Sequence, residues 1–433
     1  MVKRDLIIAA VTALAFFAAT AVLAKPIPES WNDIGRMAGI ESVTERGTWS
    51  IDASPWVHLT WDKIQLDDGK FYSDKMPLLT LIGAGVYAPL HYGLGASLAP
   101  DCATAARFCA YPWLTRLLVA LPAALMLALF FLFARRFSVP AWIALLGTLA
   151  LGLGTLIFPF TAVFNHHVPG AASLFASFYI LSARAPNPRG WLVAAGFLAA
   201  LAVSFDVLSG VFAAVLFAIA LARYRGGFAY FAAGAAVPVL LTALLDYQIA
   251  GTVLPPYMVT HGYDYPGSVF PATFAGNGTP DDYPAYAFRM FLGGKGLFAF
   301  NPLLLFAFAG ALAVALKRGH PLRVEGAAVA LGFISLCVYL ATNTGNYGGM
   351  GYSERWYIVA VPTLFAFIFF AAPLDAATWK NPGWMLFLPL LALSILSSLQ
   401  GVQAPWQDWL PPLQMTRSNQ FPVFGFKWNV KFP

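Results

Sequence analysis

Eleven apolar runs of membrane-spanning length constrain the fold of this chain more than any other feature. A helix needs roughly 20 predominantly apolar residues to cross a hydrocarbon core about 30 Å thick. Only 11% of the residues are charged, against about 25% in soluble proteins. We therefore expect one all-α polytopic membrane domain over residues 1–433, with about 11 transmembrane helices. The predicted spans are residues 5–24, 113–134, 139–163, 168–183, 190–206, 207–222, 228–249, 297–316, 324–342, 356–373 and 384–400.

Two apolar segments allow a second interpretation. Residues 76–98 contain Pro77, Pro89 and His91, and we interpret them as an interfacial helix rather than a full span. Residues 1–24 end in Ala-Val-Leu-Ala, which resembles a signal-peptidase site, so a cleaved signal peptide is the alternative there. The length of the run favours an uncleaved first helix. In either case the polar segment that follows lies outside.

The basic residues predict the orientation. With the N-terminus inside, the short inner loops hold 12 of the 26 basic residues and only three of the 20 acids, as the positive-inside rule requires. A full span at 76–98 would reverse every later loop and place these basic clusters outside. The outer face then carries a large first loop at 25–112, a second loop at 250–296 and a tail at 401–433. We expect a bacterial inner-membrane protein whose site faces the periplasm.

The basic residues do not indicate nucleic-acid binding, because no Lys/Arg-rich run or stacking platform accompanies them. Membrane lipids are the expected surroundings, and Trp406, Trp409 and Trp428 in the tail are expected to anchor at the interface. Cys102 and Cys109 flank a short polar segment of the first outer loop. A disulfide is possible there in an oxidising compartment, and two unpaired thiols are the alternative.

The polar first loop holds the first group of candidate chemical residues. Asp33 follows the first span closely, and a carboxylate there can act as a general base on a hydroxyl. Lys75 immediately precedes the interfacial helix, where an ammonium group can hold a lipid phosphate. Asp74 is either a second catalytic acid or the partner of Lys75. The plain alternatives are a solvated acid and a lysine reaching the headgroups.

A second group lies in the outer turn Asn165-His166-His167. The two histidines could hydrogen-bond a sugar or ligate a metal, but without a nearby acid they give a weak metal signal, and no Cys/His spacing typical of a metal site occurs. We therefore predict no metal ligands, although a divalent cation is possible. Asp206, at a predicted outer span end, is either functional or an ordinary helix-end acid.

The third group is the glycine-rich stretch 343–357, which ends in Tyr352-Ser353-Glu354-Arg355-Trp356-Tyr357. An arginine at a span mouth suits bidentate binding of phosphate oxygens. Pairing with Glu354 or with headgroups is the alternative for Arg355. The sequence Gly293-Gly294-Lys295-Gly296 lacks the GK[ST] ending of a phosphate-binding loop.

These motifs resemble the GT-C superfamily of integral membrane glycosyltransferases, and most closely the bacterial aminoarabinose transferase and protein O-mannosyltransferase group. That group opens its first outer loop with an acidic pair followed by an arginine or aromatic residue. The segment Asn32-Asp33-x-x-Arg36 is similar, with asparagine as its first member. Tyr72-Ser73-Asp74-Lys75-Met76-Pro77 resembles the group's Tyr-x-x-Lys-Pro-Pro motif, with methionine in place of the first proline. The stretch at 352–357 is similar to its Gly-Pro-Arg-Tyr element.

The resemblance implies an inverting transfer from a polyprenyl-phosphate-linked sugar to a lipid, glycan or protein acceptor. Asp33 would be the base, with Asp74 as a second catalytic candidate. The donor phosphate would be bound by Lys75, Arg355 and Arg36. The sugar or the acceptor would be bound by Tyr72, Asn165, His166, Tyr352 and Glu354. No cofactor is required with certainty.

Two other function classes compete with the transferase. A flippase for lipid-linked sugars predicts ionisable residues along a path through the spans, but such residues gather on one face. A non-enzymatic envelope assembly protein predicts that the basic residues at the loop–span boundaries are dispensable. Within the enzyme class, an oligosaccharide ligase remains an alternative.

Overall fold

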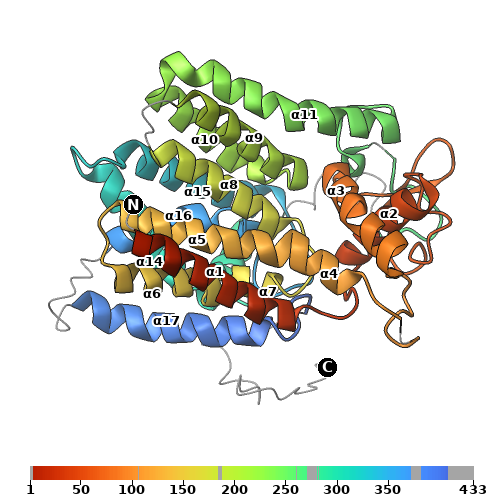
Figure 1. Cartoon of the computed structure of the whole chain (residues 1–433), viewed down its shortest axis with the longest axis horizontal. Coiled ribbons are helices and arrows are strands. Elements are labelled where there is room, and N and C mark those ends of the chain that lie inside the picture. Colours follow the sequence, from red (N-terminus) through yellow and green to blue (C-terminus); the bar gives the residue numbers. More distant parts are fainter. Residues whose placement is uncertain are drawn as a thin grey trace.

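The computed structural model describes residues 3–105, 107–183, 188–259, 261–270, 280, 282–371 and 382–407. Its long helices run side by side, and α2 (Trp31–Arg46) and α3 (Pro77–Ala88) gather at the end of this bundle opposite the N-terminus (Figure 1). The first outer loop therefore forms a cap on one end of the helices. The predicted tail is described only as far as residue 407, so Trp409 and Trp428 lie outside the described residues.

Every predicted span coincides with a helix or with a chain of helical pieces. Five of the described helices are long and apolar enough to cross a membrane alone, at Lys3–Leu23, Tyr111–Arg136, Arg225–Ala250, Arg323–Asn343 and Gly383–Gly401. The number of spans and their orientation remain predictions. The elements over these and the shorter runs are α1 (Lys3–Leu23), α4 (Tyr111–Thr115), η2 (Arg116–Ala120), α5 (Leu121–Arg136), α6 (Ala141–Leu153), α7 (Ile157–Phe160), α8 (His167–Ala183), α9 (Arg189–Phe205), α10 (Ser209–Arg223), η3 (Arg225–Gly227), α11 (Phe228–Ala250), α13 (Leu297–Phe300), α14 (Leu303–Leu316), α15 (Arg323–Asn343), η5 (Arg355–Tyr357), α16 (Val361–Phe365), η6 (Ile368–Phe370) and α17 (Pro382–Gly401).

Three predicted spans are interrupted, and the one at 139–163 divides between α6 and α7. The run at 356–373 was expected as one helix but folds as the short pieces η5, α16 and η6. Its backbone is buried from 357 to 368, and irregular backbone is tolerated at membrane depth only inside protein. The run at 297–316 breaks at Asn301-Pro302, because proline cannot continue a helix from the preceding residue.

Close helix packing depends on small residues. A Cβ atom on Gly196 of α9 would lie 1.9 Å from the carbonyl oxygen of Phe231 in α11, and one on Gly234 of α11 would lie 2.0 Å from that of Val193. The two backbones therefore touch, as in membrane helix pairs that associate through small residues. This contact positions α9 and α11 beside α3, which packs against both.

The outer cap is built from α2, a short hairpin and α3. Ser30 caps α2 and forms a capping box with Asp33, and Gly47 ends the helix with a φ of 63°. Strands β1 (Lys63–Gln65) and β2 (Phe71–Ser73) pair antiparallel, so the all-α prediction was wrong at this hairpin. Helix α3 has 12 residues and continues into the π-helical turn that follows it, and its position at the membrane interface stays a prediction. The remaining elements are η1 (Pro89–Gly93), η4 (Pro256–Met258) and α12 (Tyr283–Phe291).

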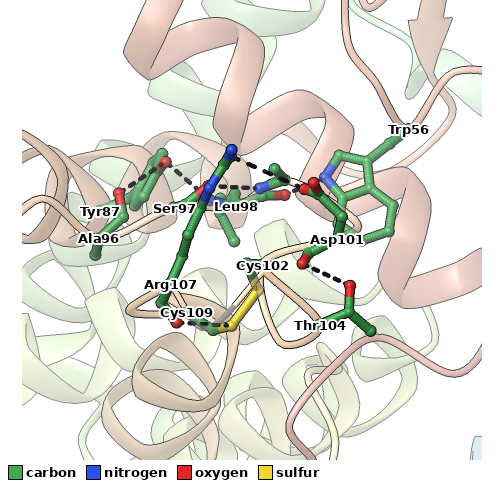
Figure 2. The surroundings of a disulfide bond; sticks show 11 residues. Trp56, Tyr87, Ala96, Ser97, Leu98, Asp101, Cys102, Thr104, Arg107 and Cys109 are labelled. Atoms are coloured by element: carbon green, nitrogen blue, oxygen red, sulfur yellow. Dashed lines mark hydrogen bonds and ion pairs between the residues drawn. A yellow bond between two sulfur atoms is a disulfide. The ribbon is translucent and has the colours of Figure 1, made fainter.

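A disulfide joins Cys102 to Cys109 beside the cap (Figure 2). The residues around it are tied by further contacts: Trp56 donates from Nε1 to the carbonyl oxygen of Leu98 at 2.6 Å. Because Tyr111 follows this closed loop directly, the disulfide limits the positions open to the start of α4.

Candidate active site

A lysine lies at the centre of a polar cluster just before α3. The ammonium group of Lys75 is 2.6 Å from Oδ2 of Asp62 and 3.1 Å from Oδ1 of Asp74. The hydroxyl of Tyr263, from the second outer loop, donates to Asp74 at 2.9 Å. Burial raises the pKa of Asp74, and the charge of Asp62 raises it further while Lys75 lowers it. The cluster therefore joins both large outer loops around one cation.

Arg36 of α2 lies buried in the same region, with 2% of its surface exposed. Its Nη2 contacts Nδ1 of His166 at 2.6 Å, whereas Nε and Nη1 have no hydrogen-bond partner among the described residues. Burial lowers the pKa of Arg36 to about 10, and the charges of Asp74 and Asp206 oppose this shift. Two buried donors without partners in the described part of the chain suit an anionic ligand atom.

The three cations predicted to bind the donor phosphate lie near enough to His166 to act on its charge, and Arg36 contacts it directly. Burial lowers the pKa of this imidazole well below its usual value, and the charges of His167, Arg36, Lys75 and Arg355 lower it further. The structure thus brings together cations from three separate parts of the sequence. Their convergence favours binding of an anion such as a phosphate group.

An acid that sequence reasoning did not associate with the histidines lies against the turn before α8. Oδ2 of Asp206 is 2.5 Å from Nδ1 of His167 and 3.9 Å from Nε2 of His166. The expectation that no acid lies near these histidines was therefore wrong. Asp206 ends α9, and the packing of α8 on α9 brings it to the turn. Hydropathy alone does not predict which helices are neighbours.

His166, His167 and Asp206 form a group whose composition suits a metal ion, with ligand atoms within 4.8 Å of one another. Arginine only donates hydrogen bonds, so the contact with Arg36 makes Nδ1 of His166 an acceptor and places the ring proton on Nε2. Neither nitrogen of His166 is then available as a ligand. Among the residues that the structure describes, this group does not fit a divalent cation as it stands.

Asp33 is fully engaged rather than free. Its Oδ1 accepts hydrogen bonds from the backbone and hydroxyl of Ser30, and its Oδ2 accepts from Glu29 N, the Tyr111 hydroxyl and Trp406 Nε1. These five bonds tie α2 to α4 and to the segment after α17. The side chain is wholly buried, and burial raises its pKa to about 6. A role for Asp33 as base remains a prediction, whereas an anchoring role follows directly from these contacts.

Trp406 therefore lies in a different place from the one expected. It is 4% exposed and contacts Asp33, and the Arg355 guanidinium lies 5.0 Å from its ring centroid. Its expected role as an interface anchor was wrong, because a buried partner for its N–H was not visible in the sequence.

The glycine-rich stretch forms a loop held by cations. Lys295 donates to the carbonyl oxygens of Gly349 and Gly351, at 2.9 and 2.8 Å, and Arg355 donates to that of Met350 at 2.9 Å. Glu354 is wholly buried, and neither carboxylate oxygen has a hydrogen-bond partner in the described part of the chain. Burial raises its pKa to about 7, although Lys295 and Arg355 lower it.

Three predicted sugar or acceptor residues are engaged elsewhere. The amide of Asn165 bonds to the backbone on both sides of its turn and caps α8. The Tyr72 hydroxyl donates to Asp68 at 2.8 Å within the hairpin. Tyr352 is wholly buried, with its hydroxyl 2.7 Å from Ser397 of α17. Their assignment to ligand binding stays a prediction without support from these contacts.

Sequence reasoning missed Asp62 and Tyr263, the partners of Lys75 and Asp74. The backbone of Asp62 packs against Gly35 of α2, where a Cβ atom would lie only 2.8 Å from the carbonyl oxygen of Asp62. The only signal in the sequence was the dipeptide Trp61-Asp62 within a polar loop. Such a dipeptide is common and does not indicate which residue Asp62 contacts. Contact with Lys75 depends on the fold of the hairpin between them.

An apolar groove begins three residues after Lys75, at the first turn of α3. Helices α3, α9 and α11 enclose a volume of about 290 Å³. Its walls are entirely hydrophobic or proline side chains, namely Leu78, Leu81, Ile82, Phe197, Leu201, Val237, Pro238 and Leu241. The side chain of Val237 is 56% exposed, so the groove is open to the surface that the bilayer would cover.

The fold is similar to that of ArnT from Cupriavidus metallidurans, an aminoarabinose transferase. Its crystal structure bound to undecaprenyl phosphate matches with a TM-score of 0.53 and 16% identity, over 92% of this chain and 66% of that chain. The apo structure matches with a TM-score of 0.52 and 16% identity, over 92% and 63%. This chain therefore spans about two thirds of the length of these proteins. No protein-family model and no curated protein matches the sequence. The predicted resemblance to GT-C membrane glycosyltransferases is confirmed at the level of the fold.

Proposed function

We propose that this chain, folded like a GT-C membrane glycosyltransferase, transfers a sugar from a polyprenyl-phosphate donor to an acceptor of the cell envelope. The observation that carries the proposal is the direct succession of a cationic cluster and an apolar groove. Lys75 ends the cluster, and Leu78 begins the groove three residues later. Lys75 lies two residues before α3, which begins at Pro77, so the groove opens at the first turn of the helix that follows the cluster. A lipid phosphate with a long apolar chain has this same succession of parts.

The groove suits the polyprenyl chain because its lining offers no hydrogen-bonding side chain. Apolar area removed from water contributes roughly 25 cal/mol per Å², and a lipid chain gains most from shape complementarity at such a surface. Leu240 of α11 is 68% exposed, so the far end of a long chain can continue into the bilayer. We therefore expect the groove to hold the first isoprene units and the bilayer to hold the rest.

The cations suit the phosphate. Arg36 offers two buried donors that have no partner among the residues the structure describes, and Lys75 adds an ammonium group. As the bond between the sugar and the phosphate breaks, negative charge develops on the phosphate oxygens, and fixed donors in a buried site stabilise it. A single displacement by an acceptor hydroxyl would invert the sugar carbon. Lipid, glycan and protein acceptors all supply such a hydroxyl.

The proposed location is the bacterial inner membrane, with the cluster facing the periplasm. The disulfide supports an oxidising compartment on the side of the cap. Nucleotide sugars are absent from that side, which favours a lipid-linked donor. The separation of the cap from the N-terminal end of the bundle (Figure 1) supports the same arrangement.

Replacing Lys75 tests the proposal. The purified Lys75→Met variant should bind undecaprenyl phosphate at least tenfold more weakly than wild type, measured by native mass spectrometry in nanodiscs. The matched control is Lys70→Met, because Lys70 is an exposed lysine of the same hairpin. Equal affinity in wild type and Lys75→Met would refute a phosphate site at this cluster.

A second variant tests the groove separately. Leu201→Trp would fill the groove between α9 and α3, so affinity should fall for undecaprenyl phosphate but not for a phosphate monoester whose chain is too short to enter the groove, such as methyl phosphate. Leu221→Trp, on an exposed face of α10, is the control. Equal losses for long and short chains would show that the groove does not hold the lipid.

A further inference from the structure

A carboxylate–imidazole pair beside the phosphate cations has no role in the binding steps described above. Nδ1 of His167 lies 2.5 Å from Oδ2 of Asp206. The other oxygen of Asp206 accepts from the backbone N–H of Leu208 at 3.1 Å, which holds the carboxylate in place. The His167 ring lies against that of His166, with 3.9 Å between centroids and 38° between the ring planes.

The hydrogen bonds define the state of each ring. Because Asp206 as a carboxylate only accepts, Nδ1 of His167 carries the proton and the lone pair lies on Nε2. His167 is 1% exposed, and Nε2 has no hydrogen-bond partner in the described part of the chain. A buried acceptor without a partner costs free energy, so the position suits a ligand that donates a hydrogen bond. A hydroxyl group is such a donor.

Resting on the proposed function, we infer that His167, oriented by Asp206, is the general base that accepts the proton of the acceptor hydroxyl. The acceptor oxygen forms a bond to the sugar carbon as the bond from that carbon to the phosphate oxygen breaks. The electron pair leaves with the polyprenyl phosphate beside Arg36 and Lys75. The proton moves to Nε2 of His167, and the carboxylate of Asp206 stabilises the resulting imidazolium. The proton returns to solvent when the product leaves.

The geometry separates the base from the leaving group in the required way. Arg36 contacts His166, and the ring of His166 lies against that of His167. The phosphate cation and the base are thus separated by one imidazole ring. A single displacement needs the incoming and leaving oxygens on opposite sides of the sugar carbon, which such a separation allows.

Other candidate bases are less suited. Asp33 already accepts five hydrogen bonds, and Asp74 is paired with Lys75 and Tyr263. Glu354 is buried without a hydrogen-bond partner among the described residues, but no second group orients it. His167 alone among these combines a vacant acceptor atom with a fixed orienting partner.

The test measures sugar transfer and lipid binding on the same full-length protein in nanodiscs. His167→Gln keeps a hydrogen-bonding side chain but cannot accept the proton, so kcat should fall about 10²–10⁴-fold. Binding of undecaprenyl phosphate should stay within threefold of wild type, which also reports that the variant is folded. Asp206→Asn should lower kcat in the same direction, and His58→Gln, at an exposed histidine of the first loop, should change neither quantity.

Three outcomes would overturn the inference. The first is His167→Gln with kcat within threefold of wild type. The second is a loss of kcat in Glu354→Gln that His167→Gln does not share. The third is one metal ion per chain by elemental mass spectrometry, removable with chelator together with activity and absent from His167→Gln. Failure of the proposed function is distinct, because wild type would then neither bind undecaprenyl phosphate nor transfer sugar from any polyprenyl-phosphate donor.

Discussion

Replacing Asp62 with asparagine should strengthen the binding of undecaprenyl phosphate. Asp62 and Lys75 form an ion pair at 2.6 Å in which both side chains are 13% exposed. A phosphate that binds Lys75 must displace this carboxylate, so the free energy of the pair is subtracted from the affinity. Removing the carboxylate removes that competition while Asp74 continues to hold Lys75 in place.

The magnitude follows from the burial of the pair. Exposed ion pairs contribute about 0–1 kcal/mol, and breaking a buried pair costs about 3–5 kcal/mol. A pair that is mostly but not wholly buried lies between these limits, at about 1–2 kcal/mol once the remaining Asp74 is considered. Since 1.4 kcal/mol corresponds to a factor of ten, Kd should fall about 5–30-fold.

Native mass spectrometry in nanodiscs would measure Kd for wild type, Asp62→Asn and Asp67→Asn. Asp67 is an exposed acid of the same hairpin, so its variant carries the same charge change without touching Lys75. An effect of net charge alone would appear equally in both variants. Unchanged or weaker binding in Asp62→Asn would refute the view that Asp62 occupies the phosphate site at rest.

Three further predictions concern stability and pH. Gly35→Ala should lower the free energy of unfolding by about 1–3 kcal/mol, because its Cβ would press on the Asp62 backbone at 2.8 Å. A Cβ at Gly85 meets nothing within 4 Å, so Gly85→Ala should be neutral or stabilising. Thermal unfolding compares the two variants, and equal midpoints would contradict the close packing at Gly35. Replacing Cys102 and Cys109 by serine should cost about 2–3 kcal/mol for so short a loop, and unchanged unfolding in the double variant would remove the disulfide as a constraint. The pKa of Asp33 is raised to about 6 in the folded protein, against a pKa of about 4 in the unfolded chain. The contribution of Asp33 to the free energy of unfolding is therefore greatest below about pH 4, and up to about 3 kcal/mol is lost as pH rises through about 6. This part of the pH dependence should be absent from Asp33→Asn.

The sequence predicted helix positions better than helix continuity. Hydropathy identifies a run by its average, so all eleven runs coincide with helical segments. It does not register single residues that interrupt a helix, such as Pro302 between α13 and α14. The broken segment at 355–370 is buried by its neighbours, and only tertiary packing makes such backbone stable at that depth.

In the candidate site, too, the sequence predicted some features and the fold decided others. Lys75 and Arg355 were predicted from residue type and position and Arg36 from its motif, and the charges of all three lower the pKa of His166, while their binding of phosphate stays a prediction. The pairing of Asp206 with His167 depends on which helices pack together. Asp33 is the converse case: the sequence shows a carboxylate after the first span, and the fold gives that carboxylate five hydrogen bonds, so its role as base stays a prediction. Residue type indicates what a group can do, and its hydrogen bonds decide whether it is available.

The distribution of charge along the helices tests the alternative hypothesis that the protein is a flippase for lipid-linked sugars. Within the described helices that match predicted spans, acidic and basic side chains lie near the ends. Asp5 pairs with Arg135, and Glu325 pairs with Arg223, at helix ends on the N-terminal side of the bundle. The phosphate cluster lies at the other end, around Lys75. A charged headgroup moved across the bilayer would need polar partners between these two ends, because an unpaired charge in lipid is costly. The arrangement therefore favours chemistry at one membrane face over movement of a headgroup through the bundle.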